Sequence, residues 1–464
     1  MPGQTPEGEK LYKGEITAYL SIVFILLVTF MGAALESASI QTAKNYYRAD
    51  MNRAIECMFA EYQKELLEEY DIFALEGSYE TGAYSEGGLF RRLAYYGADS
   101  IGQEVRRIQF LTDNGCQAFC EQAVFYMEHK YGLSGAERLL EKTGLWKRQE
   151  EEAEKYGQVE EEKQAELSRL LEENEGELPD RDNPVAHFDM LKSTPLLALV
   201  TPRSMQVSEK SVLLSDMASH RGLNAGYGDF TDVPGPSGTT CDILFGEYVL
   251  EHFSSASAGG RAGALDYEIE YILEGKASDR ENLEGVAGRL LFLRFVPNYL
   301  YIQTDSEMRA EAEGLALTLC SLLAVPAISE AAAQVILLAW AYGESILDIR
   351  ALLGGNRVPL TKTKESWQLG LSSLLTLGTA EDRSDGADVE GGLKYEEYIR
   401  MLLFLERKED AAIRALDMIE QDLRIRRGQN YFYVDYCVSK VEFFSTCTFR
   451  RGITYCFPTY FGYR

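Results

Sequence analysis

The sequence lacks an excess of basic residues, and it lacks the short motifs that mark common enzymes. It carries 46 Lys and Arg against 73 Asp and Glu, a formal net charge of −27. An acidic surface repels phosphate backbones, so no nucleic-acid partner is expected. We find no G-x-x-x-x-G-K-[ST] phosphate loop, no G-x-S-x-G nucleophile elbow and no H-E-x-x-H zinc helix. The sequence therefore predicts no enzyme, no cofactor and no small-molecule substrate.

Histidine and cysteine are scarce as well. The 4 histidines share no helical spacing, and 8 cysteines are few for 464 residues. Cys116, Cys120 and His129 lie near one another in sequence, but zinc sites prefer other spacings and need a fourth ligand. The acidic loop 382–390 offers carboxylates of the kind that Ca²⁺ prefers, but it lacks the EF-hand spacing. No metal site is predicted.

One long uncharged apolar run is present near the N-terminus. It extends from Ile16 to Leu35, reads ITAYLSIVFILLVTFMGAAL and is bounded by Glu15 and Glu36. A bilayer core of about 30 Å needs about 20 residues at 1.5 Å per residue. A cleaved signal peptide has a shorter apolar part that ends at small residues. We predict an uncleaved membrane anchor over Ile16–Leu35, with a cleaved signal peptide or a buried core helix as the alternatives.

The orientation of this anchor does not follow from the positive-inside rule, because Lys and Arg lie on both sides of it. A short leader is easier to retain in the cytoplasm than a large domain. We therefore expect a single-pass protein of the cell membrane, with its N-terminus in the cytoplasm and the bulk of the chain outside.

A second apolar region lies further along the chain. It comprises Leu315–Val325 and Ala331–Tyr342, and Pro326 and Glu330 interrupt it. Each half is shorter than a bilayer requires, so the region predicts two buried core helices instead of a second span.

The helical pattern continues beyond the anchor. Apolar and aromatic residues recur at steps of three and four, which predicts one continuous helix from Glu15 to about Tyr70. Shorter helices are expected at 89–96, 99–111 and 116–131. The Glu-rich stretch 146–175 predicts a solvated helix that projects from the body.

The C-terminal segment is dense in Tyr, Phe, Val and Thr, which favour β-strands. We predict two or three antiparallel strands, at 431–438, 441–449 and 453–461, with a two-residue turn at Arg451-Gly452. Counting outward from that turn places Cys447 opposite Cys456. The pair is the best disulfide candidate, and two half-buried thiols are the alternative.

Together these patterns predict a mostly helical α+β protein: an N-terminal transmembrane helix that runs into a long amphipathic helix, a helical head, and C-terminal antiparallel strands. The expected regions are a leader (1–15), a transmembrane helix (16–35), an amphipathic helix (36–75), a helical region with the Glu-rich helix (76–178), a loop-rich linker (179–243), a helical core (244–428) and a β-hairpin sheet (429–464).

This plan resembles the lollipop layout of type IV pilin-like proteins. Lys13-Gly14 followed by EITAYLSIVFILLVTFMGAALESASIQTAK, then FAEYQKELLEEYDIFALEGSY, resembles an uncharacterised family of bacterial single-span proteins. That family is similar in layout to the TadE/TadG-like pseudopilins of Tad pilus loci. EYILEGKASDRENLEGVAGRLLFLRFVPN and GLKYEEYIRMLLFL fit its pattern as well. The resemblance implies a component of a Tad-type pilus or secretion assembly, with protein partners there.

The same resemblance makes Gly14 a candidate processing site. Prepilin processing usually cuts after a Gly that has a Glu at the fifth following position, whereas here that position is Tyr19 and the only nearby acid is Glu15. Gly14 therefore departs from the family pattern. A membrane-anchored module that binds an envelope component is the alternative function, and an anchored enzyme with an unfamiliar site is a third.

Overall fold

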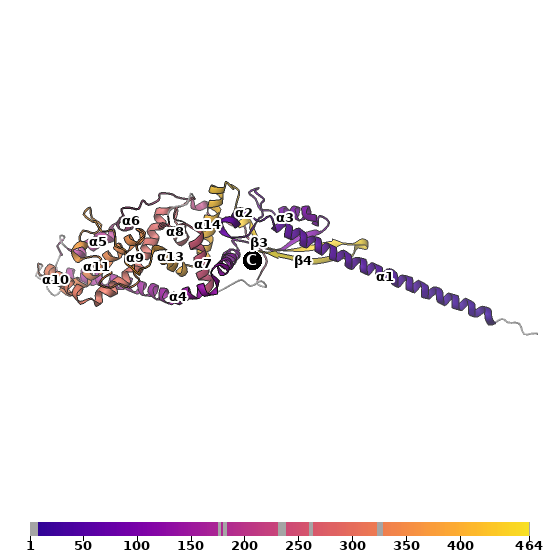
Figure 1. Cartoon of the computed structure of the whole chain (residues 1–464), viewed down its shortest axis with the longest axis horizontal. Helices are drawn as coiled ribbons and strands as arrows, with labels where there is room; N and C mark the ends of the chain where they lie inside the picture. Colours follow the sequence, from indigo (N-terminus) through magenta and orange to yellow (C-terminus); the bar gives the residue numbers. More distant parts are fainter. Residues whose placement is uncertain are drawn as a thin grey trace, which may run out of the picture.

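A long helix, a small neck and a helical head follow one another along the molecule (Figure 1). The structure is a computed structural model, and it describes residues 8–174, 178–179, 183–230, 238–258, 263–322 and 328–463. Helices dominate, and a small antiparallel sheet contains the C-terminal strands. The predicted α+β class is confirmed.

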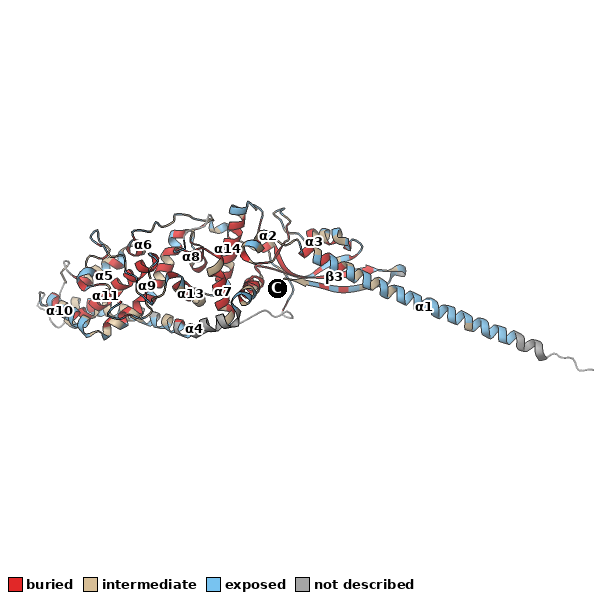
Figure 2. Ribbon diagram, viewed as in Figure 1, coloured by how far each residue is buried: buried red, intermediate tan, exposed pale blue. Residues whose placement is uncertain are grey.

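Helix α1 (Gly8–Phe59) has two unlike halves. Residues 14–39 are exposed except for the partly buried Val23, whereas Met51, Ala54, Ile55 and Met58 are buried on one face of the second half (Figure 2). Their spacing of three and four places them on the side that faces the sheet. The apolar side chains of the first half are therefore not packed against any other described part of the protein.

The long helix is broken earlier than the sequence predicts. Helix α1 ends at Phe59, and a separate helix α2 (Lys64–Tyr70) follows after a turn in which the Gln63 N–H donates to the Ala74 carbonyl at 2.8 Å. Phe59 belongs to the hydrophobic core of the neck, whereas Tyr70 belongs to that of the head. The break lets successive segments enter two different cores.

The sheet is built around strand β3 (Cys437–Thr448), which pairs antiparallel with all the other strands. These are β1 (Leu75–Glu76), β2 (Gly102–Phe110) and β4 (Thr454–Gly462). The helix predicted at 99–111 is therefore wrong, since β2 occupies most of that range. The segment expected as a first C-terminal strand is largely loop, with a short 3₁₀ turn at Val434–Tyr436.

Most of the head is an insertion between two paired strands, because β2 and β3 flank residues 111–436, and α2 joins the head core from the segment before β1. The neck thus consists of α1, α3 (Glu86–Leu93), the π-helical turn η1 (Ala94–Ala98) and the sheet. The helices of the head are α4 (Asp113–Glu173), α5 (Pro184–Ser193), α6 (Leu196–Val200), α7 (Thr239–His252), α8 (Glu268–Glu274), α9 (Asp279–Thr304), α10 (Ser306–Leu322), α11 (Ser329–Leu353), α12 (Leu371–Leu374), α13 (Tyr395–Leu405) and α14 (Lys408–Arg427).

The Glu-rich stretch forms the second part of helix α4, which lies along the head instead of projecting from it (Figure 1). Trp146 and Leu167 on α4 are buried in the head core, and Lys192 Nζ of α5 lies 2.7 Å from a carboxylate oxygen of Glu160. Its many charges occupy the solvent side. The projecting helix predicted from the charge pattern is therefore wrong.

The second apolar region forms helices of the head, as predicted. Helix α11 is buried along almost all its length in the head core. Helix α10 packs against α11 but leaves Leu317 about half exposed. Pro326, which separates the two halves in sequence, lies outside the described residues.

Candidate functional site

The predicted membrane segment, Ile16–Leu35, lies entirely within α1, and no described part of the chain buries it. None of its most apolar stretch is buried inside the protein, and Phe24 and Phe30 are 67% and 72% exposed. Soluble proteins rarely expose an apolar surface of this extent. Within the described part of the chain, α1 is the one helix long and apolar enough to cross a membrane. Its length and composition fit a membrane anchor or a signal sequence.

Gly14, the candidate processing site, lies within α1 close to its N-terminal end. It is exposed, and a Cβ added at this position would meet no atom within 4 Å. A glycine inside a helix costs roughly 1 kcal/mol relative to alanine. The packing around this position therefore does not require a glycine. Processing at Gly14 stays a prediction.

Aromatic rings fasten the second half of α1 to the β3–β4 hairpin. Phe59 stacks on Phe461 with ring centroids 4.4 Å apart and meets Tyr463 edge-on at 5.2 Å. Nearer the anchor, the Tyr47 and Phe449 ring centroids lie 5.8 Å apart. Each such pair contributes about 0.5–1.5 kcal/mol beyond simple area burial. The helix and the hairpin therefore form one packed unit directly above the exposed apolar segment.

The two cysteines expected to pair lie on the two faces of this hairpin. Cys447 is opposite Tyr455, and Cys456 is opposite Thr446, so the predicted register is wrong by one residue. The turn is longer than two residues, since the Phe449 N–H donates to the Ile453 carbonyl. Cys447 is a buried free thiol in the neck core, whereas Cys456 is an exposed free thiol.

A buried ion-pair cluster joins the head to the base of the sheet. The Arg221 guanidinium lies 2.8 Å from Glu420 of α14 and 2.6 Å from Asp435, which precedes β3. Burial raises the pKa of Glu420, and the Arg221 hydrogen bonds counter that shift. Burial lowers the pKa of Arg221, but the hydrogen bonds to Glu420 and Asp435 raise it overall. The cluster therefore holds the head on the neck while ionised.

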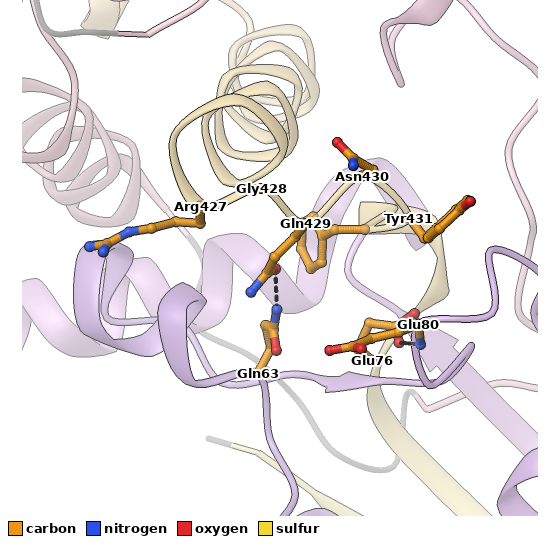
Figure 3. Close-up of a pocket in the computed structure, with 9 residues that line it drawn as sticks. Gln63, Glu76, Glu80, Arg427, Gly428, Gln429, Asn430 and Tyr431 are labelled. Atoms are coloured by element: carbon orange, nitrogen blue, oxygen red, sulfur yellow. Dashed lines mark hydrogen bonds between the residues drawn. The ribbon is translucent and has the colours of Figure 1, made fainter.

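A polar cleft of about 470 Å³ opens beside this junction (Figure 3). The Glu76 carboxylate accepts hydrogen bonds from the backbone N–H groups of Ser78 at 3.0 Å and Glu80 at 2.9 Å. Gln63 donates to Gln429 across the cleft. The lining residues come from the α1–α2 turn, from β1 and the segment after it, and from the end of α14 and the segment after it: Gln63, Glu76, Glu80, Arg427, Gly428, Gln429, Asn430, Tyr431 and Phe432.

The backbone of this cleft is held in an unusual conformation. Tyr79 and Glu80 have φ angles of 51° and 62°, which non-glycine residues seldom adopt. Gly82, with φ of 75°, packs beneath Tyr431, and a Cβ there would lie 3.0 Å from the ring. The cleft can offer amides and the Glu80 carboxylate to a polar partner, whereas the Arg427 guanidinium at its edge pairs with Glu69. The two backbone bonds to Glu76 give that carboxylate a structural role.

A second, more apolar groove of about 530 Å³ lies in the head between α4 and α9. Directly beneath it, Lys362 Nζ lies 2.8 Å from Asp348 and also pairs with Glu344. Arg294 Nε lies 3.0 Å from the other oxygen of Asp348. All four side chains are buried, and burial raises the pKa of Glu344. Two cations and two anions compensate one another here, as buried charges require.

Sequence inspection missed this network, although a signal was present. Glu344 and Asp348 stand four residues apart in a helix that is mostly apolar, so they share one face of a helix that must be largely buried. Their cationic partners Arg294 and Lys362 come from α9 and from the loop after α11, and no local pattern relates them to that face.

The histidines and the acidic loop are engaged in separate contacts. His252 stacks on Tyr248 and lies 3.1 Å from Asp71, whereas His187 contacts the Leu377 carbonyl. Burial lowers the pKa of His187. In the acidic loop, Asp382 pairs with Arg350 and Asp388 with Arg357. Across the residues described, no group of three His, Cys, Asp or Glu is placed to hold a metal ion.

Comparison with known proteins gives one family. Residues 174–449 match the model of a family of unknown function (DUF5702), a range that runs from the end of α4 through β3 and covers more than half of the chain. No curated protein and no solved structure matches. The resemblance to TadE/TadG-like pseudopilins stays a prediction, since no comparison bears on it.

Proposed function

The chain belongs to the DUF5702 family of unknown function, and we propose that it is a membrane-anchored, pseudopilin-like component of a Tad-type pilus or secretion assembly at the cell surface. Residues 16–35 cross the membrane uncleaved, residues 1–15 stay in the cytoplasm, and the neck and head lie outside. Its role is to assemble with protein partners and not to catalyse a reaction.

The observation that carries this proposal is the contrast within α1. Its first half presents a wholly exposed apolar surface, whereas its second half is packed against an antiparallel sheet by Met51, Met58 and Phe59. Lipid is the surrounding that satisfies an uncharged helix of this length. A helix that leaves the membrane and then lies on a sheet is the arrangement that the pseudopilin resemblance implies.

The use of polar groups in the cleft and the groove supports a non-catalytic role. The Glu76 carboxylate holds two backbone N–H groups, and the Lys362 cluster pairs its charges internally. Groups committed in this way stabilise the fold. Catalytic groups need instead to reach a substrate within hydrogen-bond distance.

The proposal is tested by deleting the gene and measuring pilus assembly and secretion, with complementation by the wild-type chain. We expect loss of one or both, and restoration on complementation. Complementation by a chain without residues 1–35 is expected to fail, since it lacks the anchor. Wild-type assembly and secretion in the deletion strain would contradict the proposal.

One observation favours a second candidate, a binding module for an envelope component. The polar cleft of Figure 3 is open and carries Arg427 and Glu80 at its rim. If this candidate holds, the full chain in detergent is retained on cell-wall material and an R427S/Q429A variant is not. Equal behaviour of the two proteins would count against it.

A further inference from the structure

The part of the neck nearest the anchor is basic, although the protein is strongly acidic. Residues 37–49 of α1 and residues 443–463 of the hairpin contain Lys44, Arg48, Arg450 and Arg451, and they contain no Asp or Glu. The whole chain carries a formal charge of −27. Glu36 ends the apolar segment, and the positive charge follows beyond it, on α1 from Lys44 and on the hairpin.

The hairpin brings these two segments together. It runs beside α1 toward the exposed half of that helix (Figure 1). The Lys44 Nζ lies 4.8 Å from the ring centroid of Tyr455, and the Arg48 Cζ lies 5.5 Å from the same centroid. The start of β4 is therefore level with residues 44–48, and the turn at Arg450–Gly452 lies further toward the anchor.

The height of this turn can be derived from helix and strand geometry. Lys44 is about 14 Å beyond Leu35 along the axis, at 1.5 Å per residue. The turn lies a few strand residues of about 3.3 Å each below Tyr455, which places it roughly 5–10 Å above Leu35. The headgroup layer on each side of a bilayer is about 5–8 Å thick. With Leu35 at the edge of the hydrocarbon core, the turn reaches the headgroups.

The composition of the turn suits that position. Arg450 is exposed, and Ile453 beside it is 41% exposed. Tyr and the cationic side chains are enriched where proteins meet the lipid headgroups, and anionic lipids attract juxtamembrane Lys and Arg.

We propose that Arg450, at the hairpin turn, binds the phosphates of anionic lipid headgroups, and that Lys44 and Arg48 above it complete a basic collar at this end of the neck. This inference rests on the proposed insertion of Ile16–Leu35 into the membrane. Together with the anchor, the hairpin turn then gives the neck two points of contact with the membrane. The bound lipid surface then fixes the height and the rotation of the head above it.

The test uses the full chain in vesicles with a probe at the hairpin tip. Thr454→Cys, in a background with Cys57→Ser and Cys456→Ser, carries an environment-sensitive fluorophore, and the vesicles contain a lipid with a headgroup quencher. One set is phosphatidylcholine alone, and the other includes phosphatidylglycerol. The collar variant is R450S/R451S. The matched control is R407S, which removes a largely exposed arginine of the head.

We expect stronger quenching in the anionic vesicles, lost at high salt, lost in R450S/R451S and retained in R407S. Each arginine near an anionic surface contributes about a fivefold factor, so the double variant reduces the surface-bound fraction by more than tenfold. Equal quenching in both vesicle types and in both variants overturns the collar.

Two further outcomes separate this inference from the proposed function. Release of the wild-type chain from vesicles by an alkaline wash overturns the anchor and the collar together. Retention of the chain without lipid-dependent quenching, combined with loss of assembly in cells carrying R450S/R451S, assigns the arginines to a protein partner and overturns only the collar.

Discussion

Phe59 and Phe461 stack with ring centroids 4.4 Å apart and join the first helix of the chain to its last strand. The head lies between these two residues in sequence, and all of it except α2 and the residues that follow α2 is inserted between β2 and β3. The neck can therefore close only after the chain has returned from the head. The packing of α1 on the hairpin connects the exposed apolar segment to the neck and, through the neck, to the head.

Replacing Phe59 by alanine removes this contact from the neck core. Large-to-small changes of buried Phe cost about 3–5 kcal/mol, and the loss is confined to the neck because the head has its own core. We expect faster amide hydrogen exchange in β4 and α1 after residue 47, with α11 unchanged. Tyr46→Ala, at a largely exposed position of the same helix, is the control. Equal acceleration in α11 would show that the two cores are one unit.

Arg221→Met leaves Asp435 buried without its cation and leaves Glu420 with Arg424 alone. Breaking a buried ion pair by removing one partner costs about 3–5 kcal/mol, because the remaining charge is uncompensated. We expect a lower urea midpoint, partly recovered in the double variant R221M/E420Q. Lys364→Met breaks a pair in which both side chains are exposed, and it is expected to change stability by no more than about 1 kcal/mol. Similar effects of the two single variants would contradict the structural role given to the cluster.

Stability is expected to fall with rising pH through Glu270. Burial raises the pKa of this carboxyl to about 7, despite hydrogen bonds from the Ala256 N–H and the Tyr395 hydroxyl that lower it. The unfolded value is near 4.5, so the folded state binds the proton more tightly. The stabilisation is complete below about pH 4.5 and is lost as the pH rises through about 7, a change of about 3 kcal/mol.

The check is a denaturation series from pH 4.5 to 8 on the wild type and on Glu270→Gln. The difference between the two proteins is expected to vary with pH in this window and to level off above it. Glu307→Gln, at an exposed ion pair, serves as the control. If the stability difference between the wild type and Glu270→Gln does not change with pH, Glu270 is not the source of the expected pH dependence.

Val28→Arg tests the anchor. An arginine at the centre of a spanning helix costs about 2.5–3.5 kcal/mol on insertion scales, which corresponds to roughly a hundredfold loss in membrane partition. We expect a large shift from the membrane fraction to the alkaline-wash supernatant. Leu213→Arg places the same charge at an exposed apolar residue of the head and should leave the protein in the membrane. Full retention of Val28→Arg would mean that this segment does not insert.

The sequence predicts well those features that local periodicity encodes. The exposed half of α1, the buried helix α11 and the C-terminal hairpin all follow from runs of apolar residues with a clear spacing. Each of these signals is contained within one segment. Capping, turn length and pairing partners are not needed to recognise them.

Features that depend on residues far apart in the sequence cannot be predicted from local periodicity. Ile101, Val105 and Ile108 are spaced for a helix, but β3 supplies a ladder of hydrogen bonds from the other end of the chain and makes this segment a strand. The extra residues in the hairpin turn shift Cys447 to the position opposite Tyr455. The polar cleft combines segments around Gln63 and Gln429, and no local signal connects them.

Labelling of Cys456 on intact cells tests the account most directly, because this exposed thiol lies on the part of the neck next to the anchor. A membrane-impermeant maleimide is applied before and after lysis to the wild type, to Cys456→Ser and to Cys456→Ser carrying Lys364→Cys in the head. The account predicts labelling of Cys456 and of the head cysteine without lysis, and loss of the Cys456 signal in the serine variant. Labelling that occurs only after lysis would place the neck and head in the cytoplasm and contradict a role at the cell surface.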